Sequence, residues 1–313
     1  MAKVKKGRAV SGIIVINKPL GLTSNQVLQR VKHLYGAQKA GHTGALDPLA
    51  TGVLPICLGE ATKLSQLLLD ADKAYDTTAS LGEVRSTGDA EGEVLATAPV
   101  PAFGQDEIEA VLARFRGEVV QVPPLFSALK LDGKPLYELA RQGLSAEEAQ
   151  TIADKKRRSI TIFELLLQEL RESELDLSVR CSKGTYIRTL VEDIGAALGT
   201  GAYVSRLHRT ACGPFVAAQM HRLEELERIA TQGEQALDAL LQPPQHAVPD
   251  WPQVRLSLDE ARKVLYGQSV KTSLSDAPSV QLWAFENGLE QMLGIGRVEQ
   301  GLVVPQRLFQ ISL

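Results

Sequence analysis

The sequence predicts an α+β fold in which a large first domain is followed by a small, mostly β domain. Across residues 11–250, apolar or β-branched runs of strand length are interspersed with stretches whose apolar residues recur at helical spacing. A Pro-rich linker at 241–252 then precedes short β-like runs at 280–283 and 301–304. The chain of 313 residues is long enough for two domains. We therefore expect domains at 11–250 and 251–313, behind a basic, flexible arm at 1–10.

The first strand is expected at 12–16, where β-branched residues predominate. Thr23 and Ser24 are suitable N-caps for a following helix, which should end at Gly36. We further expect the following elements in order: a buried strand at 53–58, a helix at about 60–69, a strand at 73–81, a turn at 89–92 within a hairpin or meander, and a helix that contains 108–115 and ends at Gly117.

Residues 121–158 differ in character, because Pro and Gly interrupt the periodicity and four consecutive cations occupy 155–158. This pattern is typical of a surface loop with a solvated run of charge. A pair of strands is expected next, at 159–170 and 175–182. A helix should begin near Thr185, and a strand should follow at 202–207. Arg188 falls in the first turn of that helix, where the macrodipole disfavours a cation, so a carboxylate partner would explain its presence.

The composition indicates an ordinary globular protein, with 44% hydrophobic residues and a mean hydropathy of −0.05. No apolar run is long enough to span a membrane, and the basic N-terminus lacks the apolar stretch of a signal peptide. The cysteines, at 57, 181 and 212, are odd in number and far apart, so we expect reduced, buried thiols in a cytoplasmic protein.

Charge is distributed unevenly although the net charge is only −3. Residues 1–70 carry nine Lys or Arg against three acids, which is a net charge of +6. Residues 220–313 carry eight Lys or Arg against twelve acids, which is −4. A basic first segment is compatible with binding to an RNA backbone, although solvated faces show the same pattern.

The segment 41–52, Gly-His-Thr-Gly-Ala-Leu-Asp-Pro-Leu-Ala-Thr-Gly, is the most unusual part of the chain. Its glycines permit close approach of a ligand to the backbone, and Pro48 restricts the conformation of Asp47. The apolar run that follows would anchor this loop to the core. Asp47 should therefore be a carboxylate on a rigid loop, either in a turn where it caps a backbone N–H or in a functional site.

Several kinds of site do not fit this loop. A phosphate-binding loop would end in Gly-Lys-Ser/Thr, a glycosidase would need a second acid across the substrate, and a metal site would need clustered ligands. None of these patterns is present around Asp47. What fits is a single carboxylate that acts as a nucleophile or base.

The run 41–63, GHTGALDPLATGVLPICLGEATK, closely resembles the signature of the TruB family, the tRNA pseudouridine-55 synthases. The resemblance extends over nearly the whole chain. It includes Asn17-Lys18-Pro19, Lys73-Ala74-Tyr75, Ser127-Ala128-Leu129-Lys130 and Gly184-Thr185-Tyr186-Ile187-Arg188-Thr189. It implies the pseudouridine synthase fold, a large mixed, mainly antiparallel sheet flanked by helices, with a PUA-like RNA-binding module at 251–313. It also implies that 121–158 is a mobile insertion that folds against RNA.

The resemblance implies a role for each of several residues. Asp47 matches the catalytic aspartate, Arg188 the arginine that keeps it charged through a bidentate pair, and Tyr75 the aromatic residue that stacks on the flipped-out base. Substrate-binding roles fall to the following residues: Tyr186 and Leu207 in the base pocket, His42 against the flipped nucleotides, and Lys18 and Lys63 at phosphates. No cofactor and no metal is implied. The implied partner is the T-stem-loop of tRNA, bound by a monomer that needs no protein partner.

Other functions remain open at this level. The chain could modify a different uridine or depend on a guide RNA and partner proteins, or it could be mainly an RNA-binding factor that helps tRNA to fold. The sequence also leaves open whether Asp47 attacks C1′ of the sugar, attacks C6 of the base, or removes a sugar proton.

Overall fold

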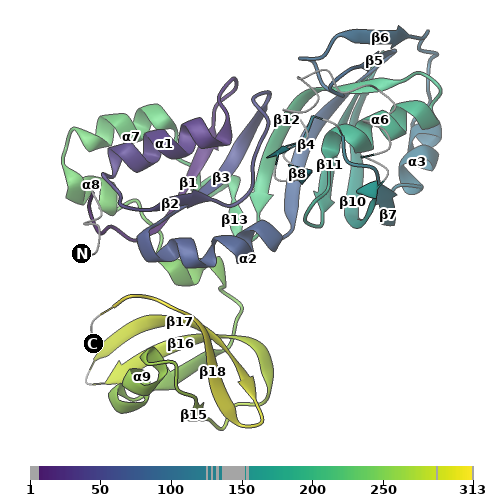
Figure 1. Ribbon diagram of the computed structural model, residues 1–313. Coiled ribbons are helices and arrows are strands. Elements are labelled where there is room, and N and C mark those ends of the chain that lie inside the picture. Colours follow the sequence, from purple (N-terminus) through teal and green to yellow (C-terminus); the bar gives the residue numbers. More distant parts are fainter. Residues whose placement is uncertain are drawn as a thin grey trace.

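The computed structural model describes residues 7–311 except 125, 128–129, 132–133, 136–151, 153–154 and 287. Most of the insertion expected at 121–158, and the first six residues of the expected arm, lie outside the described residues. Two bodies are visible in Figure 1, a larger one and below it a smaller one that carries the C-terminus.

The larger body is built on a mixed sheet that has nine strands among the described residues, with the main path β1-β3-β12-β4-β11-β10-β7. Only the β3–β12 pairing is parallel, so the sheet is mainly antiparallel, as the family resemblance implies. The strands are β1 Gly12–Lys18, β2 Ala40–His42, β3 Ala50–Leu58, β4 Lys73–Leu81, β7 Gly117–Gln121, β10 Arg158–Arg171, β11 Glu174–Cys181, β12 Ala202–Cys212 and β13 Phe215–Val216.

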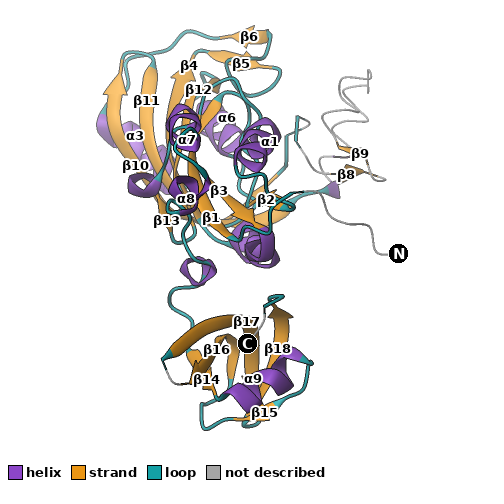
Figure 2. Cartoon of the chain, turned by 90° about the vertical axis from the view of Figure 1, so that its left-hand side faces the viewer, coloured by secondary structure: helices purple, strands orange, loops and turns teal. Residues whose placement is uncertain are grey.

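Helices flank this sheet in two groups. In Figures 1 and 2, α1 and α7 lie beside the β1–β3 end, and α3 and α6 lie against the β10–β12 part. Their bounds, with those of the short 3-10 segments, are α1 Ser24–Leu34, η1 Gly59–Leu64, α2 Ser65–Asp70, α3 Gln105–Ala113, α6 Ile187–Ala197, η2 Ala217–Gln219, α7 Leu223–Ala230, α8 Glu234–Asp238 and η3 Pro244–Ala247. Two hairpins complete the body: β5 Glu83–Arg85 with β6 Val94–Thr97, and β8 Lys130–Leu131 with β9 Lys134–Pro135.

The local signals in the sequence explain several of these elements. Thr23 caps α1 in a capping box with Gln26, and the apolar stripe of α6 is buried at Ile187, Leu190, Val191 and Ile194. The predicted strands at 73–81, 159–170 and 175–182 are confirmed. The predicted helix at 60–69 begins instead as the 3-10 segment η1, and the strand predicted at 202–207 continues to Cys212.

The smaller body is a five-stranded sheet of order β14-β16-β17-β18-β15 among the described residues, with one helix against it. This β-rich domain agrees with the predicted PUA-like module. Its elements are β14 Gln253–Leu256, α9 Leu258–Leu265, β15 Val270–Lys271, β16 Ala277–Glu286, β17 Leu289–Glu299 and β18 Leu302–Leu308.

The junction between the bodies is packed rather than open. Met292, Ile295 and Phe309 of the smaller body share an apolar cluster with Ile13 and Val15 of β1. The expected linker is also docked at its start, because Gln242 and Ile13 exchange two backbone hydrogen bonds of 2.8 Å. We expect this packing to limit the freedom of the linker.

The prediction of a flexible arm is wrong for residues 7–10. The Arg8 guanidinium donates to both carboxylate oxygens of Asp238 at 2.7 Å, and Val10 is 8% exposed in the core. A bidentate pair together with an apolar anchor fixes this segment against α8.

The three cysteines are free and buried, as predicted. Within the described residues no helix combines the length and the apolar character that crossing a bilayer requires.

Candidate active site

The Asp47 loop joins β2 to β3 and is held from several sides. Ser24 on α1 binds Leu46 twice, since its Oγ accepts from the Leu46 N–H at 2.7 Å and donates to the Leu46 carbonyl at 3.2 Å. Gly21 N donates to the Pro48 carbonyl at 2.8 Å, and Ala50 N donates to the Asp47 carbonyl at 3.0 Å. The loop is thus rigid on both sides of the carboxylate, as an active site requires.

Lys18 supports this loop from inside and does not face solvent. Its side chain is fully buried, and Nζ donates to the carbonyls of Pro19 at 2.9 Å, Pro48 at 3.4 Å and Leu22. Burial lowers the pKa of Lys18 to about 8, against the opposing effect of the nearby Asp47 charge. The phosphate contact expected for Lys18 is therefore corrected to a structural contact beneath the Asp47 loop.

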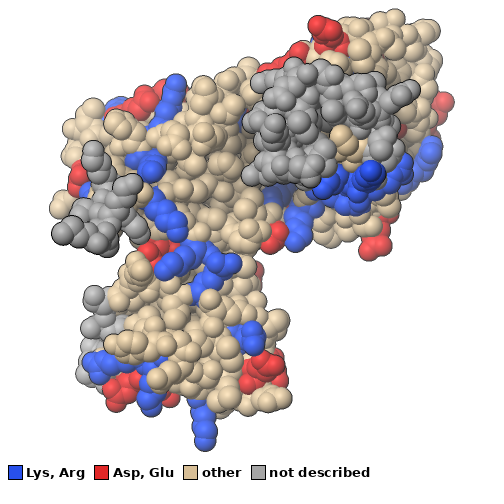
Figure 3. Space-filling view, viewed as in Figure 1, with Lys and Arg blue, Asp and Glu red and all other residues tan. Residues whose placement is uncertain are grey.

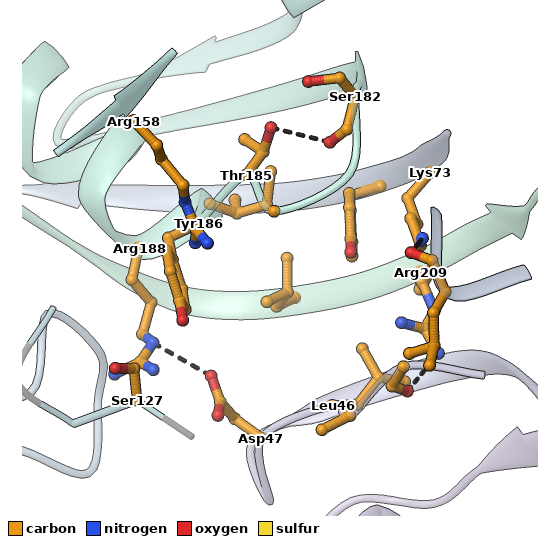
Figure 4. Close-up of a pocket in the computed structure, with 17 residues that line it drawn as sticks. Leu46, Asp47, Lys73, Ser127, Arg158, Ser182, Thr185, Tyr186, Arg188 and Arg209 are labelled. Atoms are coloured by element: carbon orange, nitrogen blue, oxygen red, sulfur yellow. Dashed lines mark hydrogen bonds and ion pairs between the residues drawn. The ribbon is translucent and has the colours of Figure 1, made fainter. Parts of the chain in front are cut away.

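Arg188 lies next to Asp47 at the start of α6. The Arg188 Nε is 3.0 Å from Asp47 Oδ2, and the arginine side chain is only 5% exposed (Figure 4). Nη1 and Nη2 donate to the carbonyls of Thr87 at 2.7 Å and Phe126 at 2.8 Å. The pairing of the two residues is therefore present, but the expected bidentate fork is replaced by a contact through Nε, because both terminal nitrogens bind backbone carbonyls.

Asp89 is a second acid near this guanidinium, and sequence reasoning assigned it only to a turn. Its side chain is 4% exposed and its Oδ2 lies 3.7 Å from Arg188 Nη1. Thr87 Oγ1 and Glu91 N donate to its Oδ1 at 2.5 and 3.1 Å. Asp89 therefore balances part of the buried arginine charge and has fixed partners of its own. A buried acid in a turn can be distinguished from an exposed one only in the folded chain.

Burial raises the pKa of Asp47 above the usual range of an aspartate. The Arg188 guanidinium opposes this rise, the Asp89 charge adds to it, and the Lys18 ammonium lowers the pKa again. The Asp47 side chain is 42% exposed, but the exposed part faces a concave cleft in which the surrounding protein replaces much of its hydration. The two nearby cations keep the charged form accessible.

The cleft next to Asp47 has a volume of about 340 Å³. Tyr75, Tyr186 and Leu207 line it together with Asp47 and Arg188, so the structure brings five of the predicted site residues to one place. Tyr75 on β4 and Leu207 on β12 point from the same sheet face, and burial raises the pKa of Tyr75 to about 12. This neutral ring and the leucine offer an apolar surface of the kind against which a base can stack.

Besides Lys18, two predicted site residues, His42 and Lys63, are not among those that line the cleft. His42 ends β2, its buried Nδ1 has no hydrogen-bond partner within the described ranges, and burial lowers the pKa of the ring. Lys63 Nζ binds Glu60 Oε2 at 2.6 Å and the Leu308 carbonyl at 2.7 Å. This ammonium thus joins η1 to the last strand of the smaller domain, and the expected phosphate contact of Lys63 stays a prediction.

Sequence reasoning missed two buried cations of the cleft. Lys73 Nζ donates to the carbonyls of Leu68, Leu69 and Ala71 at 3.2, 2.6 and 2.5 Å. Arg209 is 1% exposed and is the register partner of Tyr75 across β12 and β4. Arg209 could have been predicted from its position two residues after Leu207. In a strand that continues to residue 212, these two side chains lie on the same face.

Two further lining residues, Ser127 and Arg158, also went unassigned. Ser127 is 4% exposed, and neither its Oγ nor the buried Nε of Arg158 has a hydrogen-bond partner among the described residues. Ser127 belongs to the motif Ser127-Ala128-Leu129-Lys130 of the family resemblance, whereas Arg158 was considered only as the last residue of the basic run 155–158. Arg158 is the first residue of β10, and its side chain reaches into the cleft (Figure 4).

Family models match almost the whole chain. Residues 32–187 match the N-terminal domain model of the TruB family pseudouridylate synthases. Residues 188–249 match the tRNA pseudouridylate synthase B C-terminal domain, and 252–309 match the model called pseudouridine synthase II TruB, C-terminal.

Curated relatives are similar over their full length. The tRNA pseudouridine synthase B of Pseudomonas putida (strain GB-1) is 53% identical over 313 residues, which covers 99% of each chain. The tRNA pseudouridine synthase B of Marinomonas sp. (strain MWYL1) is 48% identical over 307 residues, which covers 98% of this chain and 97% of the relative.

Solved structures share the fold. A chain of a Cbf5-Nop10-Gar1 complex aligns with a TM-score of 0.69 at 28% identity, and the alignment covers 91% of this chain and 78% of that one. A chain from an H/ACA RNP bound to a substrate RNA containing 2′-deoxyuridine aligns with a TM-score of 0.72 at 23% identity over 99% and 92% of the two chains. The second likeness concerns the fold alone.

Proposed function

The chain belongs to the TruB family of pseudouridylate synthases, and we propose that it converts uridine 55 in the T loop of tRNA to pseudouridine. The names of the full-length relatives support a tRNA substrate. We further propose that the protein works in the cytoplasm as a monomer, without a partner protein.

The reaction is an isomerisation. The N1–C1′ bond of the uridine breaks, the uracil turns, and a C5–C1′ bond forms while C5 loses its proton and N1 gains one. No oxidation occurs and no group enters from outside. A carboxylate can promote this sequence by attack on C1′, by attack on C6, or by removal of a sugar proton.

The observation that carries the proposal is the position of the Asp47 carboxylate at the cleft, 3.0 Å from a guanidinium that is itself fixed by two carbonyls. Arg188 favours the ionised carboxylate that all three chemical routes require, and it does so from a fixed orientation. This charge is thereby kept available inside a partly desolvated site. We assign Asp47 the chemical step and Arg188 the role of holding it charged and oriented.

The walls of the cleft suit an extruded base. Removing a uridine from a folded loop requires a few kcal/mol, and stacking on an aromatic ring is worth about 1–3 kcal/mol. We assign this stacking to Tyr75, with Leu207 and Tyr186 as the neighbouring walls. Recognition of a splayed loop rather than a regular helix is typical of RNA-modifying proteins.

The test is a single-turnover assay of the purified chain with an unmodified T-stem-loop. We expect Asp47→Asn to lower the rate of pseudouridine formation by at least about 10⁴-fold, as removal of a nucleophile or base does in other enzymes. Binding of the stem-loop should be retained. The matched control is Asp76→Asn, because Asp76 follows Tyr75 in β4 and points to the opposite sheet face, where it accepts from Ser178 at 2.7 Å.

A result that contradicts the proposal is a wild-type chain that binds the stem-loop and forms no pseudouridine. In that case the protein would be an RNA-binding factor for tRNA folding, or would need a guide RNA. Retained turnover in Asp47→Asn with normal folding would instead overturn the assignment of the catalytic residue.

A further inference from the structure

Arg158 is a cation of the cleft with unused hydrogen-bond donors. Its Nε is buried and has no acceptor, and no described residue forms a hydrogen bond or ion pair with its guanidinium. Its Cζ lies 4.8 Å from the centroid of the Tyr186 ring, on the Arg188 side of the cleft (Figure 4). A guanidinium stacked on a ring still presents its N–H groups at the edge, where a planar or tetrahedral anion can bind.

The other three cations that line the cleft differ from Arg158, because each is already bound within the protein. Lys73 donates to three backbone carbonyls, and Arg209 donates to those of Val53 at 2.7 Å and Gly44 at 3.3 Å. Arg188 contacts Asp47 and two carbonyls. Asp47 is the one acid among the lining residues that the structure describes, and Arg188 is its closest cation. Arg158 is therefore the lining cation that has no counter-charge among the residues that the structure describes.

The surroundings of Arg158 hold it in place. Gly184 has φ +80°, and a Cβ there would lie 3.3 Å from the Arg158 Cζ, so a larger residue would crowd the guanidinium. Gln121 on β7 fixes the Tyr186 backbone, since its side chain accepts from the Tyr186 N–H at 3.0 Å and donates to the Tyr186 carbonyl at 3.1 Å. Such preorganisation lowers the entropy lost when a ligand binds.

Further donors reach the same cleft. Ser127 is 4% exposed, and its Oγ has no hydrogen-bond partner in the described part of the chain. The eleven-residue helix α6 begins at the cleft, and its N-terminus has no side-chain cap. The free N–H groups and the macrodipole at such an end favour an anion. The uncapped helix end and the buried unpartnered hydroxyl are independent observations, and both agree with the unpaired guanidinium.

The rim beside Arg158 is also basic. Lys155, Lys156, Arg157 and Lys183 are exposed next to the ends of β10 and β11. In Figure 3, Lys and Arg side chains gather along the lower edge of the larger body, in the part that carries these strands. An RNA backbone would be attracted to this edge, and one phosphate could then enter the cleft.

We propose that Arg158, Ser127 and the N-terminus of α6 form an anion subsite that binds a backbone phosphate flanking the target nucleotide. This inference rests on the proposed function. The subsite would position the extruded nucleotide with its sugar toward Asp47, through a contact that does not depend on the base. Arg158 is accordingly a substrate-positioning residue, and the chemical step remains with Asp47.

The test combines protein variants with substrates that each lack one phosphate charge. T-stem-loops carry a single neutral methylphosphonate at the 5′ or the 3′ phosphate of the target uridine, and binding is measured in the Asp47→Asn background. Arg158→Ala should weaken binding of the unmodified stem-loop about tenfold and lower the slope of log K against log salt by about one. At one of the two positions, the methylphosphonate should weaken binding only when Arg158 is present.

Arg180→Ala is the matched control. Arg180 also stacks on a ring, with its Cζ 4.8 Å from the Phe163 centroid, but it has Glu164 as a partner at 2.9 Å and lies outside the cleft. Its removal should leave the methylphosphonate penalties unchanged. Arg158→Lys keeps the charge without the planar fork. Its salt slope should therefore equal that of the chain with Arg158, whereas its affinity should lie between those of that chain and Arg158→Ala.

The inference is overturned if both methylphosphonate penalties are as large in Arg158→Ala as with Arg158 present, while thermal melting shows that the variant is folded. Contact with the uracil instead of a phosphate would give this result. Pseudouridine formation by the wild-type chain is measured in parallel. A failure there would reject the proposed function, whereas normal turnover with unchanged penalties rejects only the anion subsite.

Discussion

Buried charge distinguishes the larger domain from the smaller one. Lys18, Arg188 and Arg209 are 0%, 4% and 1% exposed, and each donates to backbone carbonyls around the cleft. In the C-terminal domain, Gln281 is the one buried polar side chain among the described residues, and the remaining buried side chains are apolar. The two domains thus use their interiors differently.

A buried charge destabilises a protein unless its partners are well placed, whereas an apolar interior stabilises it without orienting anything for chemistry. The buried charges at the cleft therefore lower the stability of the larger domain, but they are held in fixed orientations. The smaller domain contributes packing, both within itself and across the junction at β1. Substitutions should therefore separate into those that change turnover and those that change stability.

After Asp47→Asn, the next largest effect is expected for Arg188→Lys, which should lower single-turnover pseudouridine formation by about 10²–10³-fold. The three acceptors are spread over Nε, Nη1 and Nη2 of the planar guanidinium, so a single lysine nitrogen cannot reach Asp47 and the carbonyls of Thr87 and Phe126 at once. Rates are compared with those of Arg180→Lys on the outer sheet face. Near-normal turnover in Arg188→Lys would show that catalysis does not need a fixed guanidinium, and the functional reason given for the buried charges of the larger domain would be wrong.

In the smaller domain, Leu282→Ala should lower the free energy of unfolding by about 2–5 kcal/mol, as cavity-forming substitutions do. Leu282 is fully buried in the core of that domain. Stem-loop turnover at a temperature below unfolding should be unchanged. Leu302→Ala, at a site that is 40% exposed, serves as the control and should change stability by less than about 1 kcal/mol. A loss of turnover in folded Leu282→Ala would show that the domains are coupled in catalysis.

The acidic limb of the pH–rate profile gives a smaller effect. Because burial raises the pKa of Asp47, the carboxyl protonates at a higher pH than an ordinary aspartate does, and turnover is lost as pH falls through that raised pKa. Arg188→Gln removes the opposing charge and should move this limb to still higher pH. Single-turnover rates between pH 4.5 and 8 measure it. A limb at the same pH in both proteins would show that Arg188 does not stabilise the ionised form.

The smallest effect concerns Glu192, one turn after Arg188 on α6. Its carboxyl packs against Gly88, where a Cβ would lie 2.8 Å from Oε1, and burial raises the pKa of Glu192 to about 7 from an ordinary 4.5. The folded state therefore retains a proton that the unfolded state releases, so stability falls as pH rises from about 4.5 to 7 and is level above. Glu192→Gln should remove this slope, which denaturant unfolding at several pH values would detect. An unchanged slope would assign the pH dependence to another group.

Much of the fold could be predicted from local patterns. The capping box at Thr23, the alternation along β11 and the apolar stripe of α6 each depend on residues within one element, so spacing alone indicates them. The extension of β12 to Cys212 could not be read in this way, because its last residues pair with β4 and β13 and contain His208 and Arg209. Polar residues in a strand are tolerated when neighbouring strands satisfy them.

By itself, the sequence determined many of the elements and their order, the family resemblance and the placement of Asp47 on a loop anchored by the buried strand that follows it. Only the tertiary structure decided which charges face the cleft. Lys18 and Lys63 resemble phosphate ligands in the sequence, yet carbonyls from distant segments bind their ammonium groups. Arg158 resembles a surface charge, yet it lines the cleft, where its Nε has no hydrogen-bond partner among the described residues. The physical reason is that the partners of a long flexible cation are set by contacts between segments that are far apart in the chain.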